Sequence, residues 1–298
     1  MDLDLVGEKE IAGRLQVQPG TVHQWRKRGV LPPPAAVVSG VPVWRWETVE
    51  GWASTTGRLS GPTRAFSPPA LLAGSAPEVL DRISRSPLAR AFYLAGGTGL
   101  ALQLGHRVSR DLDFFSLQAT ESVPTRRVLD QLGRIFLPAE YTVRLRERGQ
   151  IDVAIKGVKV SFVAYPFSLE EAPVKQGPMK IAAARDIAAM KAFAIGRRAV
   201  SRDYVDLYYS LSRAMISMDD LCSKAERIFA LEDGPVFDAW LFIKQLTYTD
   251  DLDDWRTVMD DVLDRELTWD AVREYLAEAS VTWARAHVIG DGRDESEL

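Results

Sequence analysis

The amino-acid sequence predicts an α+β protein with two domains, a small helical unit that carries a β-hairpin and a larger mixed-sheet domain that ends in helices. The chain has 298 residues, which suits about two domains. A segment rich in Ser, Gly and Pro interrupts it after residue 55. We therefore expect a first domain at residues 1–58, a linker at 59–75 and a second domain at 76–298. In the second domain we expect the sheet within a core at residues 76–175 and a helical part at 180–298 without a second sheet.

The composition excludes several classes of protein. The net charge of -4 rules out binding of nucleic acid by bulk charge, so any such contact must come from local patches. One cysteine and three scattered histidines cannot form a disulfide framework or an ordinary zinc site. Any metal is therefore expected to have oxygen ligands, as Mg²⁺ and Mn²⁺ do. With no signal peptide and no long apolar run, we expect a cytoplasmic protein with no membrane segment.

The first domain has the pattern of a winged helix-turn-helix unit. Residues 7–15 form a short amphipathic helix, and Pro19 suits the first position of a second helix that Gly29 ends. Residues 37–44 alternate around a Ser-Gly turn, as a wing does, and a third helix follows at 46–53. The segment Trp44-Arg45-Trp46 and the acidic helix after it make residues 7–54 resemble modules of the MerR/excisionase type.

This resemblance implies that the second helix enters the major groove of operator DNA. The residues that would contact bases or backbone are Thr21, His23, Gln24 and Arg28. Those that would contact phosphates are Arg26, Lys27 and Arg45. The alternative interpretation is a solvated basic helix end with Trp25 in the core. A single module binds weakly, so a homodimer or a partner protein is expected.

The second domain contains a constellation suited to phosphate and metal. A buried strand at residues 91–95 leads through Gly96-Gly97 into a helix, and Asp111-x-Asp113 follows on a second strand. Glycines let the backbone approach phosphates, and the start of a helix offers free N–H groups. Residues i and i+2 of a strand point to the same side, so the two aspartates direct their carboxylates to one point. The alternative is an ordinary turn and an exposed strand face, but the two elements in this order are more specific than either alone.

Residues 93–115 closely resemble the AbiEii/MenT nucleotidyltransferase toxins of the polymerase-beta-like superfamily. The resemblance continues at residues 156–166, 186–194 and 202–208, so that it spans roughly 75–215. It implies a Mg²⁺-dependent transfer of NMP from an NTP to an RNA acceptor, with the 3′ end of a tRNA as the expected acceptor. It also implies a toxin–antitoxin or phage-defence system with an antitoxin as partner. The fused first domain would then regulate the protein's own promoter.

The resemblance carries functional roles over to individual positions of this chain. Asp111 and Asp113 match the metal-binding acids, and Lys191 matches a lysine that contacts nucleotide phosphates. Asp206 matches the acid of the last motif. The nucleotide-binding loop would comprise Gly96, Gly97, Thr98 and Ser109.

Each of the helical residues also has a plainer interpretation. Lys191 is expected at the edge of a buried helix face, as a lysine whose amine reaches solvent. Asp203, one turn before Asp206, fits a helix-start cap with Arg202 as its ion-pair partner. His106 and Arg107 are expected either to contact phosphates or to act as charges at a helix C-terminus.

One departure from the superfamily leaves the general base open. Many members carry a third carboxylate on a later strand, where this chain has Ser161. Asp152 on the preceding strand is a substitute, although an acid at a hairpin edge is the plainer interpretation. Asp206 remains the best candidate for the base. The missing acid also keeps two alternatives open: a transcriptional regulator that only senses nucleotide, and a transferase acting on a small molecule or a protein.

Overall fold

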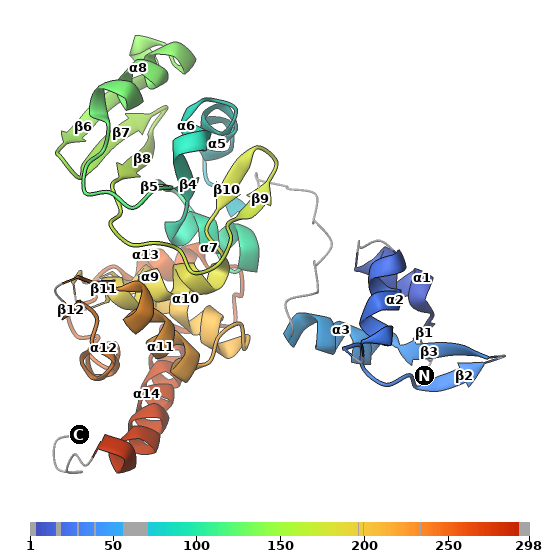
Figure 1. The fold of residues 1–298 in the computed structure, drawn as a ribbon. Helices are drawn as coiled ribbons and strands as arrows, with labels where there is room; N and C mark the ends of the chain where they lie inside the picture. Colours follow the sequence, from blue (N-terminus) through green and yellow to red (C-terminus); the bar gives the residue numbers. More distant parts are fainter. Residues whose placement is uncertain are drawn as a thin grey trace. The chain divides into compact units, whose positions relative to one another are not determined.

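A computed structural model describes residues 4–15, 19–28, 30–38, 40–55, 71–195, 197–198, 200–232 and 234–291. The chain divides into two compact units, Met1–Ser67 and Pro68–Leu298 (Figure 1). The sequence-based linker at residues 59–75 falls mostly outside the described ranges. None of the helices within these ranges is both long enough and apolar enough to cross a membrane.

Within its described residues, the first unit has a three-stranded antiparallel sheet and three helices. Its elements are β1 (Leu5–Val6), α1 (Glu8–Arg14), α2 (Pro19–Lys27), β2 (Ala36–Val38), β3 (Val41–Arg45) and α3 (Trp46–Thr55). Strand β3 lies between β1 and β2, and the β2–β3 turn contains Gly40 with φ +81°. Trp44 is buried, and its indole N–H donates to the Pro32 carbonyl oxygen over 2.8 Å. The apolar positions of the helices thus close on a small core around this tryptophan.

The second unit is built on a seven-stranded mixed sheet. Its strands are β4 (Phe92–Leu94), β5 (Leu112–Ser116), β6 (Tyr141–Arg146), β7 (Gln150–Ile155), β8 (Val158–Val163), β9 (Val174–Gln176) and β10 (Met179–Ile181). Their order is β6-β7-β8-β5-β4-β10-β9 (Figure 1). Strands β5 and β8 are parallel, as are β4 and β10, whereas the other pairs are antiparallel. The predicted mixed sheet is therefore confirmed.

The sheet extends further along the chain than the sequence suggested. The hairpin β9–β10 lies partly beyond the expected core, and Gly177, with φ +58°, makes its turn. Met179 and Ile181 are buried while β9 is polar, so alternation is visible on one strand only. The expectation of no second sheet in the helical part was also wrong, because β11 (Ala230–Leu231) pairs with β12 (Gly234–Pro235). Strands of two residues are too short to leave a periodic signal.

Helices cover one face of the sheet. They are α5 (Ala76–Ser84), α6 (Leu88–Ala91) and α8 (Thr125–Ile135), which lie in the upper part of Figure 1. Side chains of β5 and β7 alternate between buried and half-buried positions, whereas β8 has an exposed lysine and a run of three buried residues. The buried set, including Phe114, Ile151 and Phe162, joins these helices in one core. The other face of these strands carries Asp113, Asp152 and Ser161, and also Phe115, which packs on the core of the helical part.

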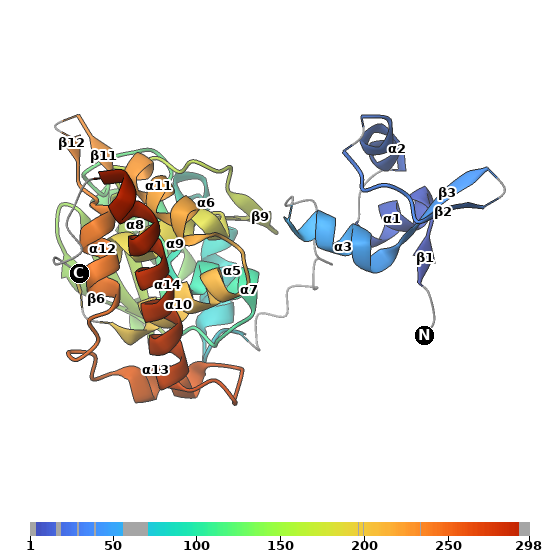
Figure 2. The ribbon, with the colours of Figure 1, turned by 90° about the horizontal axis from the view of Figure 1, so that it is seen from below.

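The helical part has a core of its own. It consists of α9 (Ala184–Ala194), α10 (Ser201–Ser212), α11 (Met218–Ile228), α12 (Ala239–Leu246), α13 (Trp255–Asp261) and α14 (Trp269–Asp291). Figure 2 shows α14 lying across the other helices of this part. Helix α7 (Gly96–Leu104) leaves the sheet and packs on α9 and α10. The residues at the start of α7 therefore lie where the sheet meets the helical part.

Candidate active site

The turn between β4 and α7 brings the backbone against Asp113. Gly96 has φ +59°, a left-handed conformation that residues with a Cβ rarely adopt. A Cβ at this position would lie 2.5 Å from Asp113 Oδ2. The Ala95 N–H donates to the Asp113 carbonyl oxygen over 3.0 Å. Both the backbone conformation and the nearness of the carboxylate therefore require glycine here.

The second glycine of the turn faces a different acid, Asp206 of α10. A Cβ on Gly97 would overlap the Arg107 guanidinium and would lie 3.4 Å from Asp206 Oδ2. The two glycines thus let one turn approach a carboxylate of the sheet and a carboxylate of the helical part. Because the first N–H groups of a helix lack helical acceptors, the start of α7 is also suited to phosphate.

Two buried hydroxyls fix this turn to the strand entry. Thr98 Oγ1 lies 2.6 Å from Ser109 Oγ, and the Thr98 hydroxyl donates to the Asp111 carbonyl oxygen. Both side chains are almost fully buried. The resemblance gives Thr98 and Ser109 a place in the nucleotide-binding loop, and in this structure their hydroxyls bond within the protein. Their visible role is to hold Asp111 in register with the turn.

Asp111 and Asp113 lie at and just before the start of β5, on the open face of the sheet. Asp111 accepts a hydrogen bond from Arg202 Nη1 at 2.9 Å, and its side chain is 25% exposed. Asp113 is half-buried and has no ion pair within the described residues. Burial raises the pKa of the Asp113 carboxyl; Lys191 opposes this effect and the neighbouring Asp111 adds to it. The pair therefore carries more negative charge than its surroundings compensate.

This pair fits a metal that is completed by the substrate. Within the described ranges, no group of three or more His, Cys, Asp or Glu side chains could hold a metal ion by itself. Mg²⁺, however, is commonly held by one or two carboxylates and completes its coordination with substrate phosphates and water. The two aspartates and the adjacent phosphate-suited turn match that pattern.

Lys191 is buried, and the expectation that its amine lies at the edge of the helix face was wrong. The side chain is 5% exposed, and Nζ lies 2.5 Å from Asp203 Oδ1 and 2.8 Å from Asp206 Oδ2. A buried ammonium is tolerated when carboxylates compensate its charge. Helix α10 supplies both acids from successive turns, and these contacts draw the lysine inward.

Asp206 is fully buried and bonded on both carboxylate oxygens. Oδ1 lies 2.7 Å from both His106 Nε2 and Arg107 Nε. Oδ2 accepts from Arg107 Nη2 at 3.0 Å and lies 2.8 Å from Lys191 Nζ. Although burial acts to raise the pKa of Asp206, Arg107 and Lys191 hold it well below its usual range. A carboxylate this acidic is a poor general base, which argues against that role for Asp206.

The neighbours of Asp206 also differ from the plainer interpretations. Asp203 is buried and pairs with Lys191 and with Arg198 Nε at 2.8 Å, not with Arg202. His106 and Arg107 are buried against Asp206 and are not exposed charges at the end of a helix. Burial lowers the pKa of His106, so that the imidazole is neutral near pH 7.

The open face of the sheet places a further carboxylate in line with Asp113. Asp113 pairs with Ser161 of β8, and Ser161 pairs with Asp152 of β7, so all three side chains are on one face. Two strand spacings separate the outer residues, which is about 10 Å. Asp152 accepts from Gln150 Nε2 at 2.8 Å. It lies on an inner strand of the sheet, so the interpretation as a hairpin-edge acid was wrong.

Sequence reasoning missed the ion pairs that assemble this site. Arg107 and Asp206 are 99 positions apart, and Arg202 and Asp111 are 91 apart. No local pattern reports such contacts. Arg198 and Asp203 are only five positions apart. This ion pair, between a cation just before a helix and an acid in its first turn, could have been predicted from the sequence.

The predicted DNA-contact residues of the first unit fall into those that lie near an acidic side chain in the described chain and those that do not. Glu8 of α1 forms an ion pair with Arg26 and lies 3.3 Å from His23 Nδ1. Arg45 lies 3.7 Å from Glu47. On α2 and in the turn after it, the predicted contact residues that are exposed and have no ion pair in the described chain are Gln24, Lys27 and Arg28. The side chain of Thr21 lies outside the described part.

A phosphate-suited turn that packs on the Asp113 carboxylate, with Asp111 two positions before it, suits a nucleotidyltransferase. Comparison with protein families agrees: residues 78–175 and 121–278 match the family described as nucleotidyl transferase AbiEii toxin, type IV TA system. These overlapping stretches together cover about two-thirds of the chain. The chain therefore belongs to the AbiEii family of nucleotidyl transferase toxins, and the resemblance of the second domain is confirmed.

The individual relatives and solved structures that this chain resembles have low sequence identity to it. An uncharacterized protein of Aquifex aeolicus is 29% identical over 202 residues, which are 66% of this chain and 90% of the relative. Two solved structures from Helicobacter pylori, a putative nucleotidyltransferase and JHP933, each share 16% identity with a TM-score of 0.44. They cover 70% and 72% of this chain, and 91% and 94% of their own. The Megavirus polyadenylate synthase shares 12% identity with a TM-score of 0.36, over 76% of this chain and 43% of its own.

Proposed function

We propose that this chain transfers a nucleotidyl group from an NTP to a hydroxyl of an RNA acceptor, with the 3′ end of a tRNA as the favoured acceptor. The single observation that carries the proposal is the Gly96-Gly97 turn, which packs at once on Asp113 of the sheet and against the Arg107–Asp206 pair of the helical part. A triphosphate on this turn would have the metal-binding acids on one side and buried positive charge on the other.

In the proposed reaction the acceptor hydroxyl attacks the α-phosphate and pyrophosphate leaves. Asp111 and Asp113 would hold Mg²⁺ or Mn²⁺, which when bound neutralises phosphate charge and activates the nucleophile. Lys191 has three N–H donors, of which two face Asp203 and Asp206, so one remains for a phosphate. Because its pKa is so low, we assign Asp206 to positioning Lys191 and not to proton transfer.

The general base remains a separate question. Asp152 is the described carboxylate in line with Asp113 on the same face of the sheet. Its backbone lies about 10 Å from that of Asp113, a span that the two aspartate side chains and one water can fill. We therefore propose Asp152 as the candidate base in place of Asp206.

An arginine-rich surface on α8, on β6 and in the turn after β6 supports RNA as the acceptor. Residues 126–148 contain six arginines. Arg126 and Arg148 have acidic partners at 3.9 and 3.5 Å. The arginines of this surface without an acidic partner in the described chain are Arg127, Arg134, Arg144 and Arg146. Arginines that no carboxylate compensates are the groups that bind nucleic-acid phosphates.

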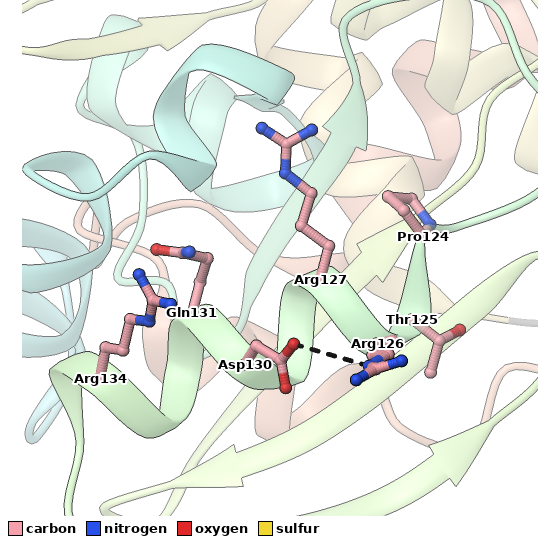
Figure 3. Close-up of a pocket in the computed structure, with 7 residues that line it drawn as sticks. All are labelled: Pro124, Thr125, Arg126, Arg127, Asp130, Gln131 and Arg134. Carbon is pink, nitrogen blue, oxygen red and sulfur yellow. Dashed lines mark ion pairs between the residues drawn. The ribbon is translucent and has the colours of Figure 1, made fainter.

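Figure 3 displays the α8 portion of this surface. Arg127, Gln131 and Arg134 follow the i, i+4, i+7 spacing that places side chains on one side of a helix. They line an open hollow of about 460 Å³ together with Pro124, Thr125, Arg126 and Asp130. Two cations and an amide on one side of a helix suit a sugar–phosphate backbone.

For the first unit we propose binding of operator DNA through α2, with autoregulation of the promoter. The exposed Gln24, Lys27 and Arg28 support this role, whereas His23 and Arg26 would first have to leave Glu8. As in other members of a toxin–antitoxin family, an antitoxin is the expected partner, and a homodimer would supply two DNA-reading modules. Lys27→Glu should weaken operator binding in a gel-shift assay without altering nucleotidyl transfer.

The decisive experiment incubates the full chain with each labelled NTP, Mg²⁺ or Mn²⁺ and total tRNA. We expect label on RNA from at least one NTP, with Asp111→Ala abolishing transfer while DNA binding persists. A labelled product that resists RNase would instead favour a small-molecule or protein acceptor. Nucleotide binding without transfer would favour the regulator that senses nucleotide, for which the Ser161 beside Asp113 is the supporting observation.

A further inference from the structure

Arg202, at the start of α10, is the cation that contacts a proposed metal ligand. Its Nη1 lies 2.9 Å from Asp111 Oδ2, and the two side chains are 40% and 25% exposed. The next residue, Asp203, turns into the buried cluster around Lys191. The first turn of α10 therefore contributes a long, partly exposed arginine to the open side of the site and a buried aspartate to its interior.

The other cations near the site are held by other acids. Lys191 and Arg107 are buried on Asp206, Arg198 is paired with Asp203, and Arg110 is paired with Asp261 at 2.6 Å. Within the described residues, Arg202 is thus the cation whose ion-pair partner belongs to the metal-binding pair. It also makes a single contact through Nη1, whereas Arg107 and Arg198 make bidentate contacts.

A divalent metal and a guanidinium compete for the same carboxylate. When a metal takes Asp111, the positive charge of Arg202 is left beside another cation, which is unfavourable. An incoming NTP resolves this conflict, because its triphosphate is an anion and a guanidinium has five donors in a fork that matches phosphate oxygens. The contact with Asp111 uses one of these donors, and partial exposure gives the side chain room to turn.

We propose that Arg202 is an exchanging counter-ion: it pairs with Asp111 in the nucleotide-free protein and moves to the triphosphate when metal and NTP bind. This inference rests on the proposed function, since it requires metal at Asp111. Arg202 would act as a nucleotide-binding residue. In the protein without metal it would also offset part of the negative charge of Asp111 and Asp113. Arg202 would thereby couple the binding of metal to the binding of NTP. Metal that binds alone leaves the displaced arginine without a partner, whereas metal that binds with NTP provides the triphosphate as its new partner.

The exchange predicts effects of opposite sign in one variant. In Arg202→Ala, Mn²⁺ alone should bind several-fold more tightly, because its competitor is gone. The same variant should bind NTP with Mn²⁺ about tenfold more weakly, because a charge-assisted contact to phosphate is lost. Arg202→Lys keeps the charge without the fork and should fall between. Arg110→Gln, which removes a neighbouring charge that contacts Asp261, is the matched control and should change neither affinity more than twofold.

Both affinities are measured on the full chain without acceptor, by calorimetry and by the electron paramagnetic resonance of free Mn²⁺, with each of the four NTPs. Thermal melting of each variant checks folding. Equal changes of the two affinities in one direction, or unchanged NTP affinity in Arg202→Ala, would overturn the exchange. Asp111→Ala separates the two levels: if it leaves Mn²⁺ binding intact, the proposed metal site itself fails and the exchange fails with it.

Discussion

The site contains two pairs of aspartates that differ in almost every physical respect. Asp111 and Asp113 are two positions apart at the start of a strand and are partly exposed. One arginine, Arg202, pairs with Asp111. Asp203 and Asp206 are three positions apart on a helix, buried, and surrounded by the cations Lys191, Arg107 and Arg198. The first pair is short of positive charge and the second has a surplus. Equal residue types therefore have different surroundings, and these separate the pair that we propose for metal binding from the pair that is buried in the framework.

The difference matters because an ion pair already satisfied cannot take part in exchange. A carboxylate with two buried donors on each oxygen has no lone pair for a metal, and removing it leaves buried cations uncompensated. Asp113, whose pKa burial raises and which has no ion pair in the described chain, would instead be stabilised by a new cation. We therefore expect the α10 pair to matter for stability and the Asp111–Asp113 pair for ligand binding, and three experiments test this division.

The largest expected effect is on stability. Asp206→Asn leaves Lys191 and Arg107 buried without their shared counter-charge and should lower the free energy of unfolding by about 3–5 kcal/mol. Asp113→Asn, the matched change in the strand pair, removes a charge whose burial is unfavourable and should change stability by less than about 1 kcal/mol. Urea denaturation measures both. Equal losses in the two variants would contradict the division of roles.

The next effect is the order in which the two pairs respond to acid. Since burial raises the pKa of Asp113, protonation should begin above the usual range of an aspartate, and Mn²⁺ affinity should fall as pH drops through that raised value. The lowered pKa of Asp206 means the reverse for stability: its contribution is present above the unfolded value and is lost only as pH falls through the lowered folded value. Metal affinity should therefore fall first, by roughly tenfold per pH unit, with the near-ultraviolet circular dichroism unchanged. Simultaneous loss of both signals would refute this order.

The smallest effect is expected on tRNA binding, through the arginine-rich surface that lies apart from Asp111 and Asp113. Arg127→Glu on α8 should weaken tRNA binding by roughly three- to tenfold at low salt and reduce the salt dependence of binding. Stability and Mn²⁺ affinity should stay the same, because the side chain is exposed and unpaired in the described chain. Arg285→Glu, an exposed arginine on α14, is the control. Equal weakening by both substitutions, in a filter-binding assay, would point to general charge and not to the α8 surface.

Local patterns were enough to predict the half of the site that is built from neighbours in sequence. Gly96-Gly97 and Asp111-x-Asp113 are short motifs whose geometry follows from one turn and one strand, and the mixed sheet followed from alternating strands. The depth of Lys191 was misjudged, because it depends on acids 12 and 15 positions away on another helix. The role of Asp206 depends on Arg107, which lies 99 positions before it. Charge compensation across the fold, unlike periodicity, leaves no mark in the local sequence.

The Arg107 guanidinium, lodged between Gly97 and Asp206, has a consequence for anyone who redesigns this protein. Three positions from three elements share one small space, so none of them is an independent design variable. Enlarging position 97 to tighten a nucleotide pocket would displace the arginine and strip a buried acid of its counter-charge. A library that randomises the turn alone would thus sample mostly misfolded chains, whereas one that varies positions 97, 107 and 206 together would search the combinations that still close the space.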